Sequence, residues 1–139
     1  QKLLCDPERR DCHDRRAQRL RSLSGSDPGA VGGSVYLVKD GKPVVTSAAD
    51  YYNSRHSRTC VGITAEGKVV MMVLDGRQEP FSAGGTAEEL AQIMLDAGCV
   101  TAINLDGGGS ATLYYNGQVM NKLINNYERP CGDFLYFTN

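Results

Sequence analysis

The stretch from Asn104 to Thr112 has the residue types best suited to chemistry. It reads Asn-Leu-Asp-Gly-Gly-Gly-Ser-Ala-Thr and joins two β-prone segments. Glycine loses more backbone entropy on folding than any other residue, so three in a row suit unusual φ/ψ angles or the close approach of another group. Successive N–H groups of such a loop can bind an anion, Asp106 can carry a proton, and Ser110 and Thr112 add hydroxyls. A tight structural turn is the alternative interpretation.

A second candidate is Asp75-Gly76-Arg77, which directly follows a strongly apolar segment. An arginine at a strand end offers a planar fork that matches phosphate or carboxylate. A turn with a surface Arg–Asp pair explains the tripeptide equally well.

Two further segments complete the candidate set. Arg58-Thr59 precedes a β-prone segment, and residues 82–86, Ser-Ala-Gly-Gly-Thr, lead into a predicted helix. Free N–H groups at a helix N-terminus bind anions, so the second segment is a candidate anion site. An ordinary N-cap at Thr86 is the alternative.

Other catalytic schemes find little support. His13 and His56 lie in a basic segment and a polar loop, so a Ser-His-Asp or Cys-His arrangement would have to recruit His56. The G-x-S-x-G, Walker and dinucleotide-binding patterns are absent. No cysteine spacing suits a metal, since Cys5, Cys12 and the adjacent His13 lack a second ligand pair. We therefore predict carboxylate and arginine chemistry without metal or cofactor.

The elements that must position these motifs are mostly β-hairpins. Asp-Gly, Glu-Gly and Asn-Gly pairs separate β-prone runs and are typical of short hairpin turns. Residues 69–74 are apolar on both faces, which is typical of a central strand. The predicted strand pairs are residues 35–38 with 43–46, 59–64 with 68–74, and 111–115 with 118–120; residues 100–105 and 134–137 are predicted as single strands.

The clearest helix is predicted over residues 87–97. Thr86 and Glu89 have the spacing of a capping box, and Gly98 is placed to end the helix. Its apolar stripe consists of Leu90, Ile93, Met94 and Ala97. We expect an α+β fold, with a mixed, largely hairpin-connected β-sheet, this one clear helix and room for a second helix in the N-terminal segment.

Composition indicates one domain and limits the partners. The chain has 139 residues, 41% of them hydrophobic, and a net charge of −1, so no nucleic-acid footprint and no membrane span are predicted. Residues 1–24 hold seven Lys/Arg against four Asp/Glu. We interpret residues 1–31 as a basic arm and linker, solvated or docked on a polyanion, and residues 32–139 as the domain. Five cysteines, an odd number, leave at least one unpaired and favour an extracytoplasmic location.

Together the motifs resemble the phosphodiester glycosidase family. The resemblance extends from about Gly33 to the C-terminus, in order and spacing. The triple-glycine motif carries most of it, and the remaining segments are Ser57–Thr59 with Val61–Ile63, Val73–Arg77, Ser82–Gly84 with Thr86, Asn116-Gly117, Asn121 and Glu128-Arg129-Pro130.

The resemblance implies a hydrolase that releases a sugar, typically N-acetylglucosamine, from a sugar-1-phosphodiester. A phosphate leaving group is already acidic, so the demand shifts from a general acid to groups that hold the phosphodiester. Arg77 and Arg58 would hold phosphate oxygens, and Asp106 or Asp75 would be the carboxylate near the anomeric carbon or its attacking water. Glu128 and Arg129 would hold the sugar. The other implied substrate contacts are Thr59, Ser82, Gly84, Thr86, Asn104, Gly107, Gly108, Gly109, Ser110, Thr112 and Asn121.

The family domain also extends upstream, through a Phe-rich segment that residues 1–32 do not contain. We therefore expect one of two arrangements: an upstream polypeptide segment, separate or cleaved, completes the domain, or the protein is a trimmed version whose pocket is partly missing. A non-catalytic phosphoglycan-binding module with the same fold is the alternative function.

Overall fold

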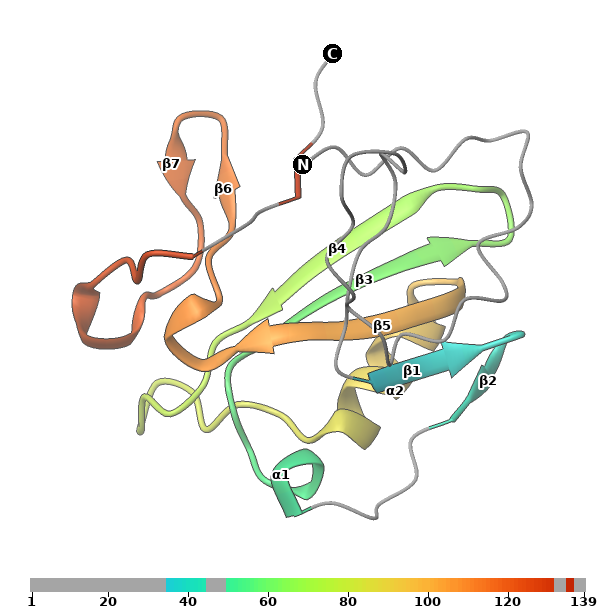
Figure 1. Cartoon of the computed structure of the whole chain (residues 1–139), viewed down its shortest axis with the longest axis horizontal. Coiled ribbons are helices and arrows are strands. Elements are labelled where there is room, and N and C mark those ends of the chain that lie inside the picture. The colour runs from blue at the N-terminus through green and yellow to red at the C-terminus, as the bar shows by residue number, and fades with distance from the viewer. Residues whose placement is uncertain (1–34, 45–49, 132–134, 137–139) are drawn as a thin grey trace, which may run out of the picture.

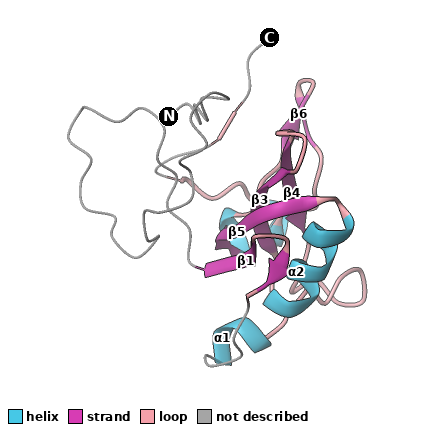
Figure 2. Cartoon of the chain, turned by 90° about the vertical axis from the view of Figure 1, so that its right-hand side faces the viewer, coloured by secondary structure: helices cyan, strands magenta, loops and turns pink. Residues whose placement is uncertain are grey.

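The chain folds into a five-stranded β-sheet with one helix packed along a face (Figures 1 and 2). The computed structural model describes residues 35–44, 50–131 and 135–136. Every strand pairing in the sheet is antiparallel, and the α+β class predicted from the sequence is confirmed. The elements are β1 (Val35–Lys39), β2 (Lys42–Pro43), α1 (Asp50–Asn53), β3 (Arg58–Thr64), β4 (Val69–Leu74), α2 (Ala87–Asp96), β5 (Cys99–Gly107), the 3-10 turns Gly108–Ser110 and Ile124–Asn126, and the separate hairpin β6 (Tyr114–Tyr115) and β7 (Gln118–Val119).

The three predicted hairpins form at the predicted turns. Asp40-Gly41 and Asn116-Gly117 each have two consecutive positive φ angles, 51° and 70° in the first pair and 48° and 82° in the second. This is the turn conformation that twists with the flanking strands and that Asn-Gly and Asp-Gly favour. Local residue chemistry therefore determines these connections.

The strand order is β2-β1-β5-β3-β4, so β5 and β3 are central. The expectation that residues 69–74 form a central strand was wrong: among the described residues β4 pairs with β3 alone and lies at the edge. All six of its residues are half-buried. Apolar residues on both faces of a strand show that both faces are covered. They do not show whether the strand has hydrogen-bonded neighbours on both sides in the sheet.

The core lies between the sheet and α2. Leu37 of β1, Cys60 of β3 and Ala102 of β5 are buried against Leu90 and Met94 of the helix. A Cβ on Gly62 would lie 2.8 Å from Met94 Cε and 2.9 Å from the backbone oxygen of Thr101, which cannot turn aside, so this position favours glycine. The predicted apolar stripe is thus the packing face, although Ile93 is 40% exposed.

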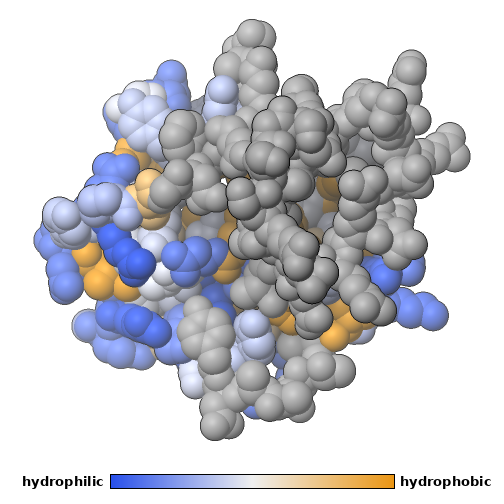
Figure 3. All heavy atoms as spheres, viewed as in Figure 1, coloured by the Kyte–Doolittle hydropathy of each residue, from blue (hydrophilic) through white to orange (hydrophobic). Residues whose placement is uncertain are grey.

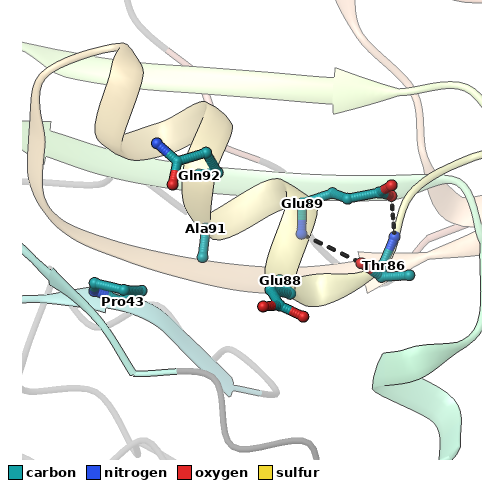
Figure 4. Close-up of a pocket in the computed structure, with 6 residues that line it drawn as sticks. All are labelled: Pro43, Thr86, Glu88, Glu89, Ala91 and Gln92. Atoms are coloured by element: carbon teal, nitrogen blue, oxygen red, sulfur yellow. Dashed lines mark hydrogen bonds between the residues drawn. The ribbon is translucent and has the colours of Figure 1, made fainter.

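Helix α2 begins at the predicted capping box. Glu89 N donates to Thr86 Oγ1 (3.2 Å), and Thr86 N donates to Glu89 Oε2 (3.0 Å), as Figure 4 shows. These bonds satisfy two N–H groups that the first turn would otherwise leave unpaired. The helix ends at Asp96, one residue before the predicted end, and Gly98 follows with φ of 82°.

Some sequence expectations fall outside the described residues. The arm, its helix, residues 45–46 of the first hairpin, Cys5 and Cys12 all lie there. Of the predicted last strand only Leu135 and Tyr136 are described, and neither is in a strand. None of the described helices is long and apolar enough to cross a membrane.

Candidate active site

The topology brings the predicted motifs to one end of the sheet. Arg58 at the start of β3 pairs with Leu74 at the end of β4 and with Gly107 at the end of β5. Because β4 and β5 both run antiparallel to β3, the loops that follow β4 and β5 leave at the same end of the sheet, beside the segment that enters β3. These loops gather at the left-hand end of the sheet in Figure 1. On the face seen in Figure 3, that end is mostly hydrophilic with a few hydrophobic residues between.

The glycine loop is joined to Ser57 by backbone and side chain. Gly108 N donates to Ser57 O (3.1 Å), and Ser57 Oγ donates to Gly108 O (3.0 Å). A Cβ on Gly107 would lie 2.4 Å from Ser57 O, and Gly108 has φ of 62°. The close approach and the unusual backbone angle that three glycines suggested both occur here.

Two amides of this loop are engaged within the protein. Gly107 N donates to Asp106 Oδ1 (2.8 Å), and Gly108 N donates to Ser57 O. This arrangement argues against the predicted anion contact for these two N–H groups. The Asp106 side chain is nevertheless exposed, and no described residue donates to its Oδ2. Its carboxylate is therefore held by one oxygen and open to solvent at the other.

Arg77 lies against the glycine loop. It adopts φ of 57°, uncommon for a residue with a side chain and found preferentially at functional sites. Its Nε donates to His56 Nδ1 (2.7 Å), and its NH1 lies 3.7 Å from the position that a Cβ would take on Gly108. An exposed guanidinium is thus held against Gly108, which follows Asp106 by two residues in the chain.

The carboxylate of Asp75 is committed to structure. Its Oδ1 accepts from Asn121 Nδ2 (3.2 Å), its Oδ2 from Lys122 N (3.0 Å), and its backbone O from Ser82 Oγ (2.7 Å). Asn121 in turn donates to Ala111 O (2.9 Å) and accepts from Leu113 N (2.7 Å). These bonds argue against the predicted roles of Asp75 as the reacting carboxylate and of Asn121 as a substrate contact.

Arg58 is fully buried, with no exposed surface. Its Nε donates to Gly85 O (3.3 Å) and its NH2 to Ser54 O (3.0 Å), so the side chain ties the entry to α2 to the segment before β3. A buried guanidinium held by backbone carbonyls argues against the predicted grip on a substrate phosphate. The physical reason is the register of β3: Arg58 lies two residues from Cys60, so both face the same side of the sheet, and both are buried.

Of the two residues predicted to hold the sugar, only one lies at the glycine loop. Arg129 packs on the glycine loop, since its Cδ lies 3.6 Å from the Cβ position of Gly109, whereas Glu128 is exposed with no described contact to the site. Ser110 O accepts a weak bond from Cys131 Sγ (3.9 Å). The hydroxyls of Thr59 and Thr112 are buried and have no hydrogen-bond partner among the described residues. Asn104 is buried and donates to Leu105 O (2.6 Å).

The helix-entry candidates divide between packing and capping. Gly84 packs on His56, because a Cβ there would lie 2.4 Å from His56 O. Thr86 serves as the N-cap, the alternative interpretation for this segment. The hollow beside Thr86 in Figure 4 lies between Pro43 and the first turns of α2 and contains none of Arg77, Asp106 or the glycine loop.

Sequence reasoning missed His56. It considered this residue only for a nucleophile triad, and the structure instead places it as the acceptor for Arg77, 21 residues away in sequence. Burial lowers the pKa of His56 below its ordinary value, and the charges of Arg77 and Arg58 lower it further. No sequence signal could have found the pair, because only the fold brings the two loops together.

In the part of the chain that the structure describes, no group of three or more His, Cys, Asp or Glu residues is placed to hold a metal ion. The groups that the structure places at the glycine loop are the guanidinium of Arg77 and the carboxylate of Asp106, and the imidazole of His56 accepts from Arg77. This set suits the binding of an anionic group beside a proton-carrying carboxylate.

The chain is similar to proteins of known and unknown activity. The protein YomE of the SPbeta prophage of Bacillus subtilis (strain 168), described as uncharacterized, is 36% identical over 104 residues, 73% of this chain and 16% of that protein. N-acetylglucosamine-1-phosphodiester alpha-N-acetylglucosaminidase of Bos taurus is 42% identical over 67 residues, 48% of this chain and 12% of the enzyme. The chain thus spans only a small part of the length of either relative.

Two solved structures share the fold. A hypothetical protein from Synechocystis superimposes with a TM-score of 0.60 at 28% identity, over 69% of this chain and 18% of that one. The catalytic domain of zebrafish N-acetylglucosamine-1-phosphodiester alpha-N-acetylglucosaminidase, auto-inhibited by its pro-peptide, gives a TM-score of 0.58 at 28% identity, over 67% of this chain and 34% of that one.

The family match covers nearly the whole chain. The sequence profile of the phosphodiester glycosidases matches residues 8–138, and so begins within the segment interpreted as a basic arm. With the shared motifs at one end of one sheet, the chain belongs to the phosphodiester glycosidase family.

Proposed function

We propose that the protein contributes to a hydrolase that cleaves a sugar, N-acetylglucosamine in the first instance, from a sugar-1-phosphodiester. The observation that carries the proposal is the position of Arg77, whose exposed guanidinium lies against Gly108 of the glycine loop, two residues after Asp106 in the chain. Family membership supplies the reaction class. The named activity of the bovine and zebrafish relatives supplies the sugar.

Arg77 is the group we assign to the phosphodiester. Its Nε is held by His56, and no described residue accepts a hydrogen bond from its NH1. A guanidinium binds phosphate oxygens through charge-assisted hydrogen bonds, which are about twice as strong as neutral ones. In the transition state negative charge accumulates on the departing phosphate, so a cation fixed there stabilises the transition state more than the ground state.

Asp106 is the group we assign to the anomeric centre. One of its oxygens accepts from Gly107 N, which fixes the side chain, while the other is open to solvent. A carboxylate in this position activates a water molecule or attacks the anomeric carbon directly, and it stabilises the oxocarbenium-like charge. Asp75 is not assigned this role, because both of its oxygens accept hydrogen bonds from the protein.

A binding module without hydrolysis is the second candidate. The superposition covers 34% of the zebrafish catalytic-domain chain, so residues outside this match can belong to the complete site. The cysteine count predicts an extracytoplasmic location. An upstream polypeptide segment that completes the domain remains the proposed partner.

The test is release of N-acetylglucosamine from UDP-N-acetylglucosamine, with the chain assayed alone and within the longest natural polypeptide that contains it. Asp106→Asn keeps an acceptor for Gly107 N, so it preserves the loop and removes only the charge. We expect kcat to fall about 10²- to 10⁴-fold. Arg77→Ala should lower kcat/KM about 10- to 100-fold.

Matched controls lie away from the site. Lys68→Ala removes a cation at the opposite end of β3 and β4, and Asp96→Asn removes a carboxylate at the end of α2; both should leave turnover unchanged. Binding of UDP-N-acetylglucosamine that depends on Arg77, with no sugar release in either polypeptide, would establish the binding module instead. Turnover that survives both site changes would refute the assignments.

A further inference from the structure

The backbone of His56 is held where its ring meets the site. His56 N donates to Gly85 O (3.3 Å) and His56 O accepts from Gly85 N (3.1 Å), an isolated antiparallel bridge. Gly76 and Gly84 pack on this backbone so closely that a Cβ on either would lie 2.6 Å or less from an atom of His56. The ring therefore projects from a rigid part of the protein.

Arg77 is held by its backbone but depends on His56 for its side chain. Arg77 N donates to Ala83 O (3.4 Å), and φ of 57° sets the direction in which the side chain leaves. The Nε–H donates to His56 Nδ1 at 2.7 Å, and NH2 lies 3.3 Å from Nε2 of the same ring. One edge of the guanidinium thus faces the imidazole, and NH1 faces the glycine loop.

We propose that His56 is a positioning residue, which as a neutral imidazole holds the guanidinium of Arg77 in the orientation that receives a substrate phosphate. The proposal rests on the function proposed above and adds a residue that does not itself touch substrate. Nδ1 accepts a hydrogen bond only when it carries no proton. The neutral ring with its proton on Nε2 is therefore the form that matches the shorter contact, and in this form the 3.3 Å approach of NH2 to Nε2 is not a hydrogen bond.

Protonation of His56 would reverse this contact. Nδ1 would then carry an N–H that faces the Nε–H of Arg77, and a cation would face a cation. The other charged groups near the ring are Arg58, whose charge acts on His56, and the ion pair of Arg55 with Glu89, in which Arg55 NH1 also donates to Gly84 O (2.7 Å). Burial and the two arginines Arg77 and Arg58 lower the pKa of His56 below the ordinary 6.5, so the neutral form dominates at neutral pH and is lost only as the pH falls through that lowered value.

The first experiment measures the contact without any substrate. The imidazole of His56 is titrated by NMR in the full chain and in Arg77→Met, with His56→Asn assigning the signal against His13, the other histidine. Removing a nearby cation and the donor to Nδ1 should raise the pKa of His56. An unchanged titration in Arg77→Met would overturn the proposal, whether or not the protein has any activity.

The second experiment asks whether the contact serves turnover of UDP-N-acetylglucosamine. His56→Leu removes the acceptor and should raise KM about tenfold, the cost of one hydrogen bond to a charged group. His56→Asn keeps an acceptor near the Nδ1 position and does not titrate, so it should keep KM within about twofold of wild type. It should also remove the acid limb of kcat/KM that belongs to His56, leaving any carboxylate limb at lower pH.

The two proposals fail differently. Full turnover and an unchanged acid limb in His56→Leu would refute the positioning role and leave the hydrolase intact. A titration of His56 that shifts in Arg77→Met, without release of sugar from UDP-N-acetylglucosamine, would refute the hydrolase and leave the contact intact. If His56→Leu does not fold, as shown by circular dichroism, the titration in Arg77→Met and the pH profile of His56→Asn still decide.

Discussion

Asn121 is tied to Asp75 across 46 residues of sequence, with Nδ2 placed 3.2 Å from Oδ1. The same amide donates to Ala111 O at 2.9 Å. The segment after β7, the end of β4 and the chain beyond the glycine loop therefore meet at one side chain. The carboxylate of Asp75, which the sequence analysis offered for chemistry, therefore holds these loops together.

Replacing Asp75 with Asn should destabilise the protein. An amide can still pair with Asn121 through its oxygen, but its NH2 cannot accept from Lys122 N, so one N–H loses its acceptor. We expect a loss of about 1–2 kcal/mol in the free energy of unfolding, measured by urea denaturation. Asp96→Asn, which affects only an exposed bond with Gln92, should cost less than about 0.5 kcal/mol. If Asp75→Asn lost turnover while its stability stayed unchanged, Asp75 would instead be assigned as the reacting carboxylate.

Gly76→Ala should be costly for a steric reason. A Cβ there would lie 2.4 Å from Ser57 N, 2.6 Å from His56 C and 2.7 Å from Gly84 Cα, all of them backbone atoms that cannot turn aside. Forced displacement of packed backbone costs about 1–3 kcal/mol or more. The control variant is Gly67→Ala, where a Cβ meets nothing within 4 Å. There only the positive φ of 79° destabilises the fold, by about 1–2 kcal/mol. Thermal unfolding of the two variants is the measurement. An equal drop in Tm for both would mean that the backbone around His56 moves to make room for the Cβ.

The Glu89 carboxylate should make stability depend on pH. Its pKa is lowered, first by the hydrogen bond from the backbone of Thr86 and also by Arg55, while burial opposes the shift. A lowered pKa stabilises the fold above the unfolded value of about 4.5, and this stabilisation disappears as the pH falls through the folded value. The Tm difference between wild type and Glu89→Gln should therefore be largest above the unfolded value and shrink as the pH falls through the lowered folded value. Glu88→Gln, an exposed neighbour outside the capping box, should show a smaller difference, and equal curves for the two variants would contradict the capping role.

The cysteines should differ sharply in reactivity. Burial raises the pKa of the Cys60 thiol to about 12 and the charge of Arg58 opposes this shift, whereas Cys131 is exposed. The thiolate is the reactive form, so at pH 8 about one Cys60 in 10⁴ is reactive even before access is considered. Iodoacetamide labelling followed by peptide mass spectrometry should modify Cys131 within minutes and Cys60 only after unfolding in urea. Comparable native rates for the two would show that the core opens readily.

Much of the secondary structure was readable from the sequence, because it depends on neighbours along the chain. Asn116-Gly117 favours positive φ at both positions wherever it occurs, and Thr86 with Glu89 satisfies the first helical turn within four residues. The same holds for the glycine loop, whose three glycines announce an unusual backbone and a close contact. These features and the family resemblance were determined by the sequence alone.

The tertiary structure decided which distant residues meet. Among the described residues strand β4 lies at the edge although its pattern suggested the centre, since pairing partners depend on long-range contacts that local hydropathy does not encode. The same reason separates Arg58, drawn into the core by the register of β3, from Arg77, which is held exposed by His56. Residue types named the groups available for chemistry, and only the antiparallel pairing of β3 with β4 and β5 decided which of them face one another.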